Sequence, residues 1–255
     1  MNCGTQPKRS ALLLLTLALA APASAAEAQK LHYALSVDGQ AIGFRDLTVS
    51  YLPGEYGEVR ILESWTELSL PIAGKTFRYQ QRLAGKGGSG GFASAIAENG
   101  VAREVQAVRG PEGWIVSVAE GQTAKVYNYG FDELDLTTLS LIDPGVNEQL
   151  QGKTQLRVLA AESGAVLTGP LKEVGASQIK VGGQQIPVTE YIWTLPEGEV
   201  KLDYGSTGHL VRYTMNVAGH KVIATLDAPP PERTWGAAID GPLIGVGGSL
   251  GETEL

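Results

Sequence analysis

Cysteine and histidine are scarce in this chain of 255 residues. The single cysteine, Cys3, precedes the first apolar stretch and would be removed with a cleaved leader, which leaves no thiol for a disulfide or for lipid attachment. The three histidines, His32, His209 and His220, are widely separated and show none of the spacings typical of zinc sites. We therefore expect no disulfide, no bound metal and no cofactor.

Positive charge is also in deficit. The chain has 20 Lys and Arg against 27 Asp and Glu, a formal net charge of -7, and loss of Lys8 and Arg9 with a leader would make it -9. A surface of this sign repels a phosphate backbone and gains nothing from anionic lipid surfaces. Nucleic acid is therefore not an expected partner.

The acidic residues include one local cluster, Asp132, Glu133 and Asp135. Their oxygens are ligands that calcium accepts, but the segment lacks the regular order of acidic residues and glycine found in calcium loops. A solvated helix start is the preferred interpretation.

Long apolar runs are absent except near the N-terminus. Ala11 to Ala21 are apolar apart from Thr16, follow Lys8 and Arg9, and are succeeded by Ala23-Ser24-Ala25. This order predicts a signal peptide over residues 1–25, cleaved after Ala25, because the run is too short to cross a bilayer. The protein is then exported, to the periplasm in a Gram-negative cell or otherwise outside the cell, with no transmembrane segment after cleavage.

The remaining sequence is dominated by alternation of apolar and polar residues. Leu31, Tyr33, Leu35 and Val37 alternate with polar or small neighbours, and Asp38-Gly39 then predicts a hairpin turn into a second alternating strand. The same pattern, with glycine-bearing turns, gives about fifteen strand-like segments between Leu31 and Leu226.

This pattern predicts an all-β domain over residues 26–226. An antiparallel meander of so many strands exceeds the roughly eight that close into a barrel filled by its own side chains. We expect either a large curved sheet, such as a half-barrel around a groove, or a two-sheet sandwich. Residues 227–255 are rich in proline and glycine and are interpreted as a flexible tail.

One segment has a different spacing. Leu136, Leu139 and Ile142 lie three residues apart behind Asp135, a residue type common at helix N-caps, and Pro144 would end a helix. We therefore expect one short helix against the sheet, as a lid or plug if there is a groove.

A glycine-rich loop carries two motif-like sequences. Gly87 to Gly91 match G-x-S-x-G, with Ser89 in the nucleophile position, and Gly85 to Gly90 match G-x-G-x-x-G. The first motif requires a strand-to-helix turn and the second a βαβ unit, yet Phe92 to Glu98 alternate like a strand. A hairpin loop is the preferred interpretation of both.

Aromatic side chains are few but come from well-separated strands: Trp65, Phe77, Tyr79, Phe92, Trp114, Tyr127 and Trp193. Such rings converge on a core, a cavity or a partner surface. An ordinary core is the default. The candidate ligand-binding residues are Trp65, Phe77, Trp114 and Trp193.

The C-terminal third contains a recognisable arrangement. Val181 to Val188, Tyr191-Ile192-Trp193 and Tyr204 to Val211 resemble the end of exported bacterial domains of unknown function, although Gly205 stands where those domains have an aspartate. Tyr33 to Phe44 and Asp135 to Leu139 are also similar. The resemblance implies a periplasmic β-sheet protein with no assigned activity. Its layout is similar to the half-barrel carriers of lipoproteins or lipids.

Three functional hypotheses follow. The first is a non-catalytic envelope protein that binds a lipid-like apolar ligand or an envelope protein partner. The second is a structural or assembly factor whose sheet edges pair with another envelope component. The third is a serine hydrolase that uses Ser89, against which the missing helix argues.

Overall fold

The computed structural model describes residues 27–55, 57–88 and 90–230 of the chain. The predicted signal peptide, Ser89 and positions 231–255 of the predicted tail lie outside the described residues. Among the helices of the described residues, none is long and apolar enough to span a membrane.

The described chain forms a single sheet of fifteen strands with two short helices. This confirms the predicted all-β class and, of the two arrangements left open, selects the large curved sheet over the two-sheet sandwich. The first half consists of β1 Glu27–Val37, β2 Gln40–Gly54, β3 Gly57–Ile72, β4 Lys75–Lys86, β5 Phe92–Glu98, β6 Val101–Arg109, β7 Gly113–Glu120 and β8 Thr123–Gly130. The second half consists of β9 Leu136–Thr137, α1 Thr138–Leu141, α2 Asn147–Leu150, β10 Gln155–Leu159, β11 Val166–Val181, β12 Gln184–Leu195, β13 Gly198–Gly205, β14 Leu210–Val217 and β15 His220–Leu226.

The two halves are meanders that join in the middle of the sheet. The strand order runs from β8 back to β1, crosses to β15, and continues back to β9. β1 pairs antiparallel with β15, with Tyr33 opposite Leu226. Only the β9–β10 pair is parallel among the described strands. The first and last strands of the meander thus lie at the centre of the sheet, and β8 and β9 are its edges.

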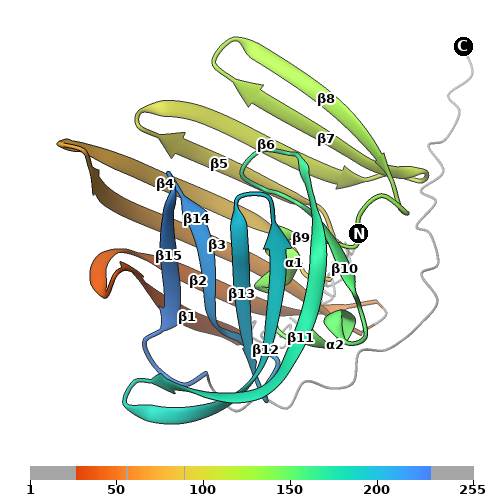
Figure 1. Cartoon of the computed structure of the whole chain (residues 1–255). Coiled ribbons are helices and arrows are strands. Elements are labelled where there is room, and N and C mark those ends of the chain that lie inside the picture. The colour runs from red at the N-terminus through yellow and green to blue at the C-terminus, as the bar shows by residue number, and fades with distance from the viewer. Residues whose placement is uncertain (1–26, 56, 89, 231–255) are drawn as a thin grey trace, which may run out of the picture.

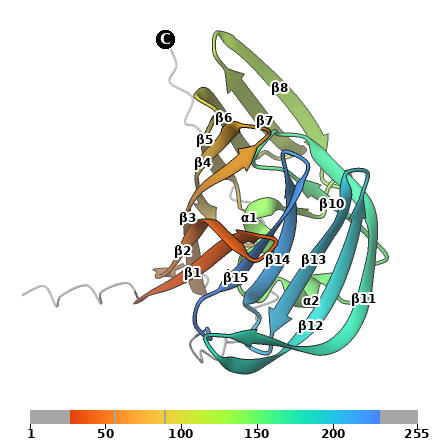
Figure 2. The ribbon, with the colours of Figure 1, turned by 60° about the vertical axis from the view of Figure 1, so that its left-hand side comes forward.

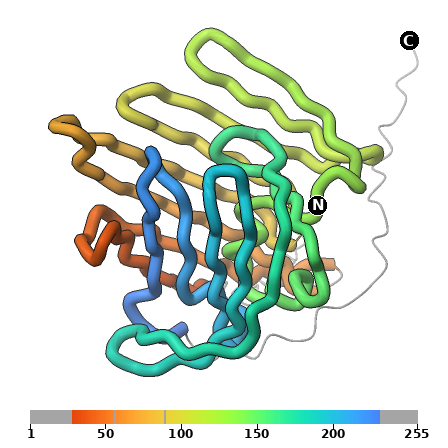
Figure 3. Tube along the Cα trace, in the orientation of Figure 1, coloured from red at the N-terminus to blue at the C-terminus, as the bar shows by residue number. Residues whose placement is uncertain are grey.

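The sheet is strongly curved, so that the inner faces of its two halves look toward each other (Figures 1 and 2). The tube in Figure 3 shows the long hairpins of both halves following this curve. Contacts cross the interior: the Tyr33 hydroxyl donates to the carbonyl of Leu210 at 2.7 Å, and the Tyr204 hydroxyl donates to that of Leu141 at 2.9 Å.

The inner face follows directly from the alternation in the sequence. Leu31, Tyr33 and Leu35 of β1 are buried, and so are Leu47 and Val49 of β2. Burial of such apolar side chains, at about 25 cal/mol per Å² of surface removed from water, is the main driving force for this curved arrangement. The two-residue turn predicted at Asp38-Gly39 is present, with φ of 49° and 78°.

The predicted helix is present as α1, but its N-cap was predicted wrongly. Thr137 caps α1, accepting from the backbone N–H of Ser140 in a reciprocal capping box. Asp135 instead accepts from Lys153 and Arg157. These hydrogen bonds outweigh the effect of partial burial and lower the pKa of Asp135 to about 2. The second helix, α2, was not predicted, and it has no side-chain cap that could have marked it.

Helix α1 lies on the inner side of the sheet. A Cβ atom added at Gly85 of β4 would lie 2.7 Å from a methyl group of Leu139 and 2.4 Å from the carbonyl oxygen of Gly91, just before β5. The absence of a side chain at Gly85 therefore permits the close approach of α1. The helix occupies one end of the space between the two halves.

Candidate functional site

A cavity of about 430 Å³ lies between the two halves of the sheet. Apolar side chains from both halves form most of its walls: Leu68 and Phe77 from the first half, and Trp193, Leu195, Val200, Leu202, Met215 and Val217 from the second. Leu141 and Ile142, in and just after α1, line it as well. Concave, mostly apolar spaces of this size are typical small-molecule sites.

One charged side chain lies deep in this cavity. Arg45 is on the inner face of β2, the same face as Leu47 and Val49, and is only 7% exposed. Its Nε donates to the hydroxyl of Thr66 at 2.7 Å, and a terminal nitrogen donates to that of Tyr213 at 2.6 Å. The second terminal nitrogen donates a longer bond, 3.4 Å, to the amide oxygen of Gln81.

The charge on Arg45 is maintained despite its burial. Burial by itself lowers the pKa of Arg45, but Tyr213 and Glu162 more than offset this effect and raise it. No carboxylate oxygen among the described residues lies within 4.0 Å of the guanidinium. The cavity therefore contains a buried cation whose hydrogen-bond partners are all neutral.

Glu162 approaches the same region from the turn between β10 and β11. Its carboxylate accepts from Gln81 at 3.5 Å, and its backbone carbonyl accepts from Arg103 at 3.2 Å. In the same turn, the carbonyl of Gly164 accepts from the hydroxyl of Tyr129 at 3.0 Å. Side chains of β6 and β8 thus donate hydrogen bonds to backbone carbonyls of this turn. These bonds, and not strand pairing, connect the second half of the sheet to β6 and β8.

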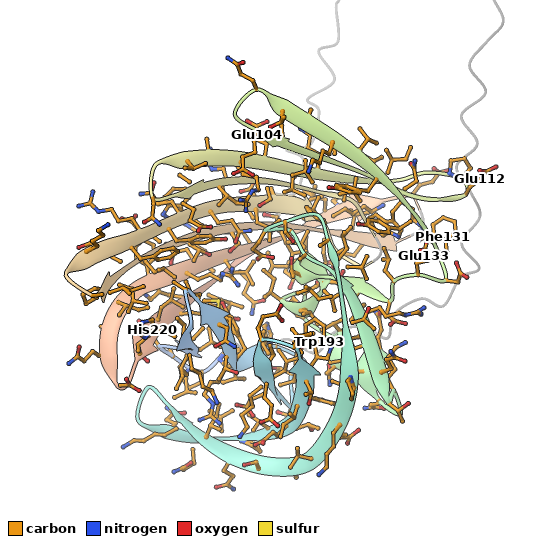
Figure 4. All side chains as sticks on the ribbon, turned by 45° about the horizontal axis from the view of Figure 1, so that its top comes forward. Glu104, Glu112, Phe131, Glu133, Trp193 and His220 are labelled. Carbon is orange, nitrogen blue, oxygen red and sulfur yellow. The ribbon has the colours of Figure 1, made fainter. Side chains whose placement is uncertain are left out.

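Trp193 lines the cavity and carries a polar atom without a partner among the described residues. It lies on β12 on the inside of the curve (Figure 4) and is 2% exposed. Its Nε1 is buried without a hydrogen-bond partner among the described residues. A buried N–H without an acceptor costs about 1–3 kcal/mol.

The four predicted binding residues do not form one group. Phe77 and Trp193 line the cavity, as does Tyr79. Trp65 is half-buried on the outer face, opposite the exposed Asp46 and Arg82 in the strand register. Trp114 is buried beside a separate hollow of about 330 Å³ near the β6–β7 turn.

The remaining predicted aromatics are also dispersed. Phe92 is part of the buried core. Tyr127 is 38% exposed on β8, where its ring stacks on Tyr129. The widely spaced aromatic residues therefore divide among core, cavity and surface.

The sequence interpretation missed Arg45, although a signal was present. Positions 45, 47, 49 and 51 share one face of β2, and three of them carry the apolar residues Leu47, Val49 and Tyr51. A cation in phase with an apolar face must be buried or must alter the strand. Attention to this exception would have singled out Arg45.

The glycine-rich loop connects two antiparallel strands, β4 and β5, and no helix follows it directly. Ser89 itself lies outside the described residues. Gly88, just before it, donates its N–H to Asp143 at 2.7 Å, and its carbonyl accepts from the Ser140 hydroxyl at 3.0 Å. The loop thus has neither the strand-to-helix turn of a nucleophile elbow nor the βαβ unit of a dinucleotide site.

The histidines are placed in separate environments. His32 is exposed and lies 2.5 Å from a carboxylate oxygen of Asp46, whereas His209 is in the core. Within the described ranges, no group of three His, Cys, Asp or Glu residues is arranged to hold a metal ion.

A solved structure has the same fold. It is a beta-barrel-like protein of the domain of unknown function DUF1849 from Brucella abortus, to which the chain aligns with a TM-score of 0.56. The alignment covers 80% of this chain and 98% of that one, at 9% sequence identity. No family model and no curated protein matches the sequence. This similarity shows the fold alone and agrees with the predicted resemblance to a β-sheet family of unknown function.

Proposed function

We propose that this chain is an exported, non-catalytic protein of the cell envelope that binds a lipid-like ligand between the two halves of its sheet. The observation that supports this proposal is the apolar cavity of about 430 Å³. Strands of both halves form its walls. In a plain scaffold, these strands would be expected to pack against each other and to leave no such cavity. Export rests on the signal-peptide pattern of residues 1–25.

A titration with straight-chain alcohols tests this proposal without any dependence on charge. We expect saturable binding of dodecanol, and a tighter complex with each methylene added to shorter alcohols. Burial of one methylene contributes about 0.8 kcal/mol, which corresponds to about a fourfold change in affinity. Affinity that does not depend on chain length, or no binding of any alcohol, would contradict the proposal.

Tryptophan fluorescence locates the binding site. Trp193 lines the cavity and Trp65 lies on the outer face. We therefore expect Trp193→Phe to remove most of the fluorescence change caused by dodecanol and Trp65→Phe to preserve it. Calorimetric titration of both variants checks that binding itself remains. A signal that disappears in Trp65→Phe and persists in Trp193→Phe would place the ligand elsewhere.

A second candidate function is a scaffold that pairs with another envelope component through a sheet edge. The observation in its favour is an apolar group on the outer face near the β8 edge, formed by Val108, Ile115 and Val126, which are 50–64% exposed. Exposed apolar strands at an edge favour pairing with another chain. Native mass spectrometry of protein purified gently from its own envelope distinguishes the two functions, because it detects a small ligand or a partner chain by mass.

A further inference from the structure

Arg45 has more donors than the protein supplies with acceptors. A guanidinium carries five N–H donors, and within the described chain three of them are directed to Thr66, Tyr213 and Gln81. This leaves two N–H groups on a side chain that lines the cavity. Glu162 acts on Arg45 through space, but every group that hydrogen-bonds to the guanidinium in the described structure is neutral, so the two remaining N–H groups have no charged acceptor.

Other residues with donor groups line the same space. Trp193, from the second half of the sheet, has an Nε1 that is buried without a partner in the described structure. Tyr79 lines the cavity too, and burial raises the pKa of its hydroxyl, which therefore keeps its proton and remains able to donate. Unused donors around a cation are the complement of an anionic group with several acceptor oxygens.

The surrounding charges restrict which anion fits. Glu162 and Glu98 also line the cavity and have electrostatic effects on Tyr79. Because the cavity already holds these two carboxylates beside one arginine, each further negative charge is disfavoured, and a dianionic phosphate monoester brings two of them whereas a carboxylate brings one. A monoanionic carboxylate is therefore favoured over a phosphate.

The size of the cavity restricts the remainder of the ligand. Its volume of about 430 Å³ is at the lower end of the range of about 300–1,000 Å³ for small-molecule sites. The apolar walls formed by Leu68, Phe77, Leu195 and Met215 match an alkyl chain. This volume favours a single chain over a lipid with two acyl chains.

We propose that the ligand is a single-chain fatty acid whose carboxylate binds Arg45 and whose alkyl chain lies along the apolar walls of the cavity. This inference rests on the proposed binding function and adds the ligand class to it. The alternative is that Arg45 has a structural role only, as the link among Thr66, Gln81 and Tyr213.

The test compares dodecanoate with dodecanol at neutral pH, where the two ligands differ only in the headgroup. We expect the wild-type protein to bind dodecanoate about 10- to 100-fold more tightly, the range expected for hydrogen bonds to a charged group. Equal affinities would overturn the carboxylate assignment and leave the binding function intact. Failure of both ligands to bind would instead overturn the binding function.

Variants assign the preference to Arg45. Arg45→Met should reduce the dodecanoate-to-dodecanol ratio to about one, and Arg45→Lys, which retains the charge, should keep part of it. Arg82→Met is the matched control, because Arg82 is exposed on the outer face; its ratio should stay that of the wild type. An unchanged ratio in folded Arg45→Met would overturn the proposal.

Glu162 provides a test that leaves the arginine in place, and so remains available if Arg45→Met does not fold. Glu162→Gln removes a negative charge that acts on Arg45. We expect it to raise the ratio of dodecanoate affinity to dodecanol affinity severalfold. A lower ratio in Glu162→Gln would overturn the proposal, and so would a wild-type preference for dodecyl phosphate over dodecanoate.

Discussion

At the residue scale, His209 is the clearest case of a titratable group whose behaviour the fold controls. Its side chain is completely buried, and its ring nitrogens lie 2.8 Å from the Thr207 hydroxyl and 3.1 Å from the amide oxygen of Gln29. Because an amide oxygen only accepts, the nitrogen facing Gln29 must carry the proton. Burial lowers the pKa of His209 to about 4, so the ring is neutral at physiological pH.

This lowered pKa predicts a pH-dependent loss of stability. The unfolded chain binds a proton at His209 near the ordinary pKa of 6.5, whereas the folded protein binds it only near about 4. The contribution of His209 to the free energy of unfolding is therefore fully present above pH 6.5. It decreases as the pH falls from 6.5 to 4, by up to roughly 3 kcal/mol.

Urea denaturation of the wild type and of His209→Gln across that pH range checks this prediction. The variant should be less stable at neutral pH, and its free energy of unfolding should depend less on pH. His220→Gln is the matched control, since His220 lies at the start of β15 and is only half-buried. Parallel pH profiles for the wild type and His209→Gln would contradict the assignment.

At the element scale, the two-residue turns differ in how well their residues suit them. The β1–β2 and β5–β6 turns use Asp38-Gly39 and Asn99-Gly100, residue pairs that accept positive φ at both positions. The β3–β4 turn has Ala73 at φ 46°. An alanine in this left-handed region is strained by its Cβ, with a cost of about 1–2 kcal/mol.

We therefore expect Ala73→Asn to stabilise the protein by about 0.5–1 kcal/mol, because asparagine tolerates the left-handed conformation. Thermal and urea melts measure the change. Ala95→Asn is the matched control: Ala95 is exposed within β5, where asparagine is disfavoured and should be neutral or destabilising. Equal effects of both substitutions would show that the turn conformation is not responsible.

At the scale of the whole molecule, burial is unevenly distributed along the sheet. The central strands β1 and β15 have neighbours on both sides and contribute Tyr33, Leu35, Val222 and Ala224 to the core. The edge strand β8 has no buried residue and pairs on one side only. Regions with few buried contacts and exposed backbone hydrogen bonds open more readily than the core.

Hydrogen exchange should therefore rank the strands by their position in the sheet. We expect amides of β8 to exchange fastest among the long strands and those of β1 and β15 to exchange most slowly. A ligand in the cavity should slow exchange at β2 and β12, which carry Arg45 and Trp193, and should have little effect at β8. Protection of β8 equal to that of β1 would show that its free edge is covered in solution.

The sequence by itself determined the local elements. Alternation of apolar and polar residues is a property of neighbours along the chain, so it identified the inner face of β1 and β2, and turn residues such as Asp38-Gly39 fixed the hairpin. It also indicated the segment of α1, although the hydroxyl of Thr137 and not Asp135 caps the helix. Whether about fifteen strands form one curved sheet or two packed sheets was left open.

Only the tertiary structure decided how the sheet closes and what its interior contains. The pairing of β1 with β15 joins segments almost two hundred positions apart, and no local pattern encodes such a contact. The same long-range geometry brings Arg45, Glu162 and Trp193 to one cavity and leaves Trp65 on the outer face. Alternation along a strand places each side chain on one of the two faces of the sheet. The curvature of the assembled sheet then determines which face encloses the cavity.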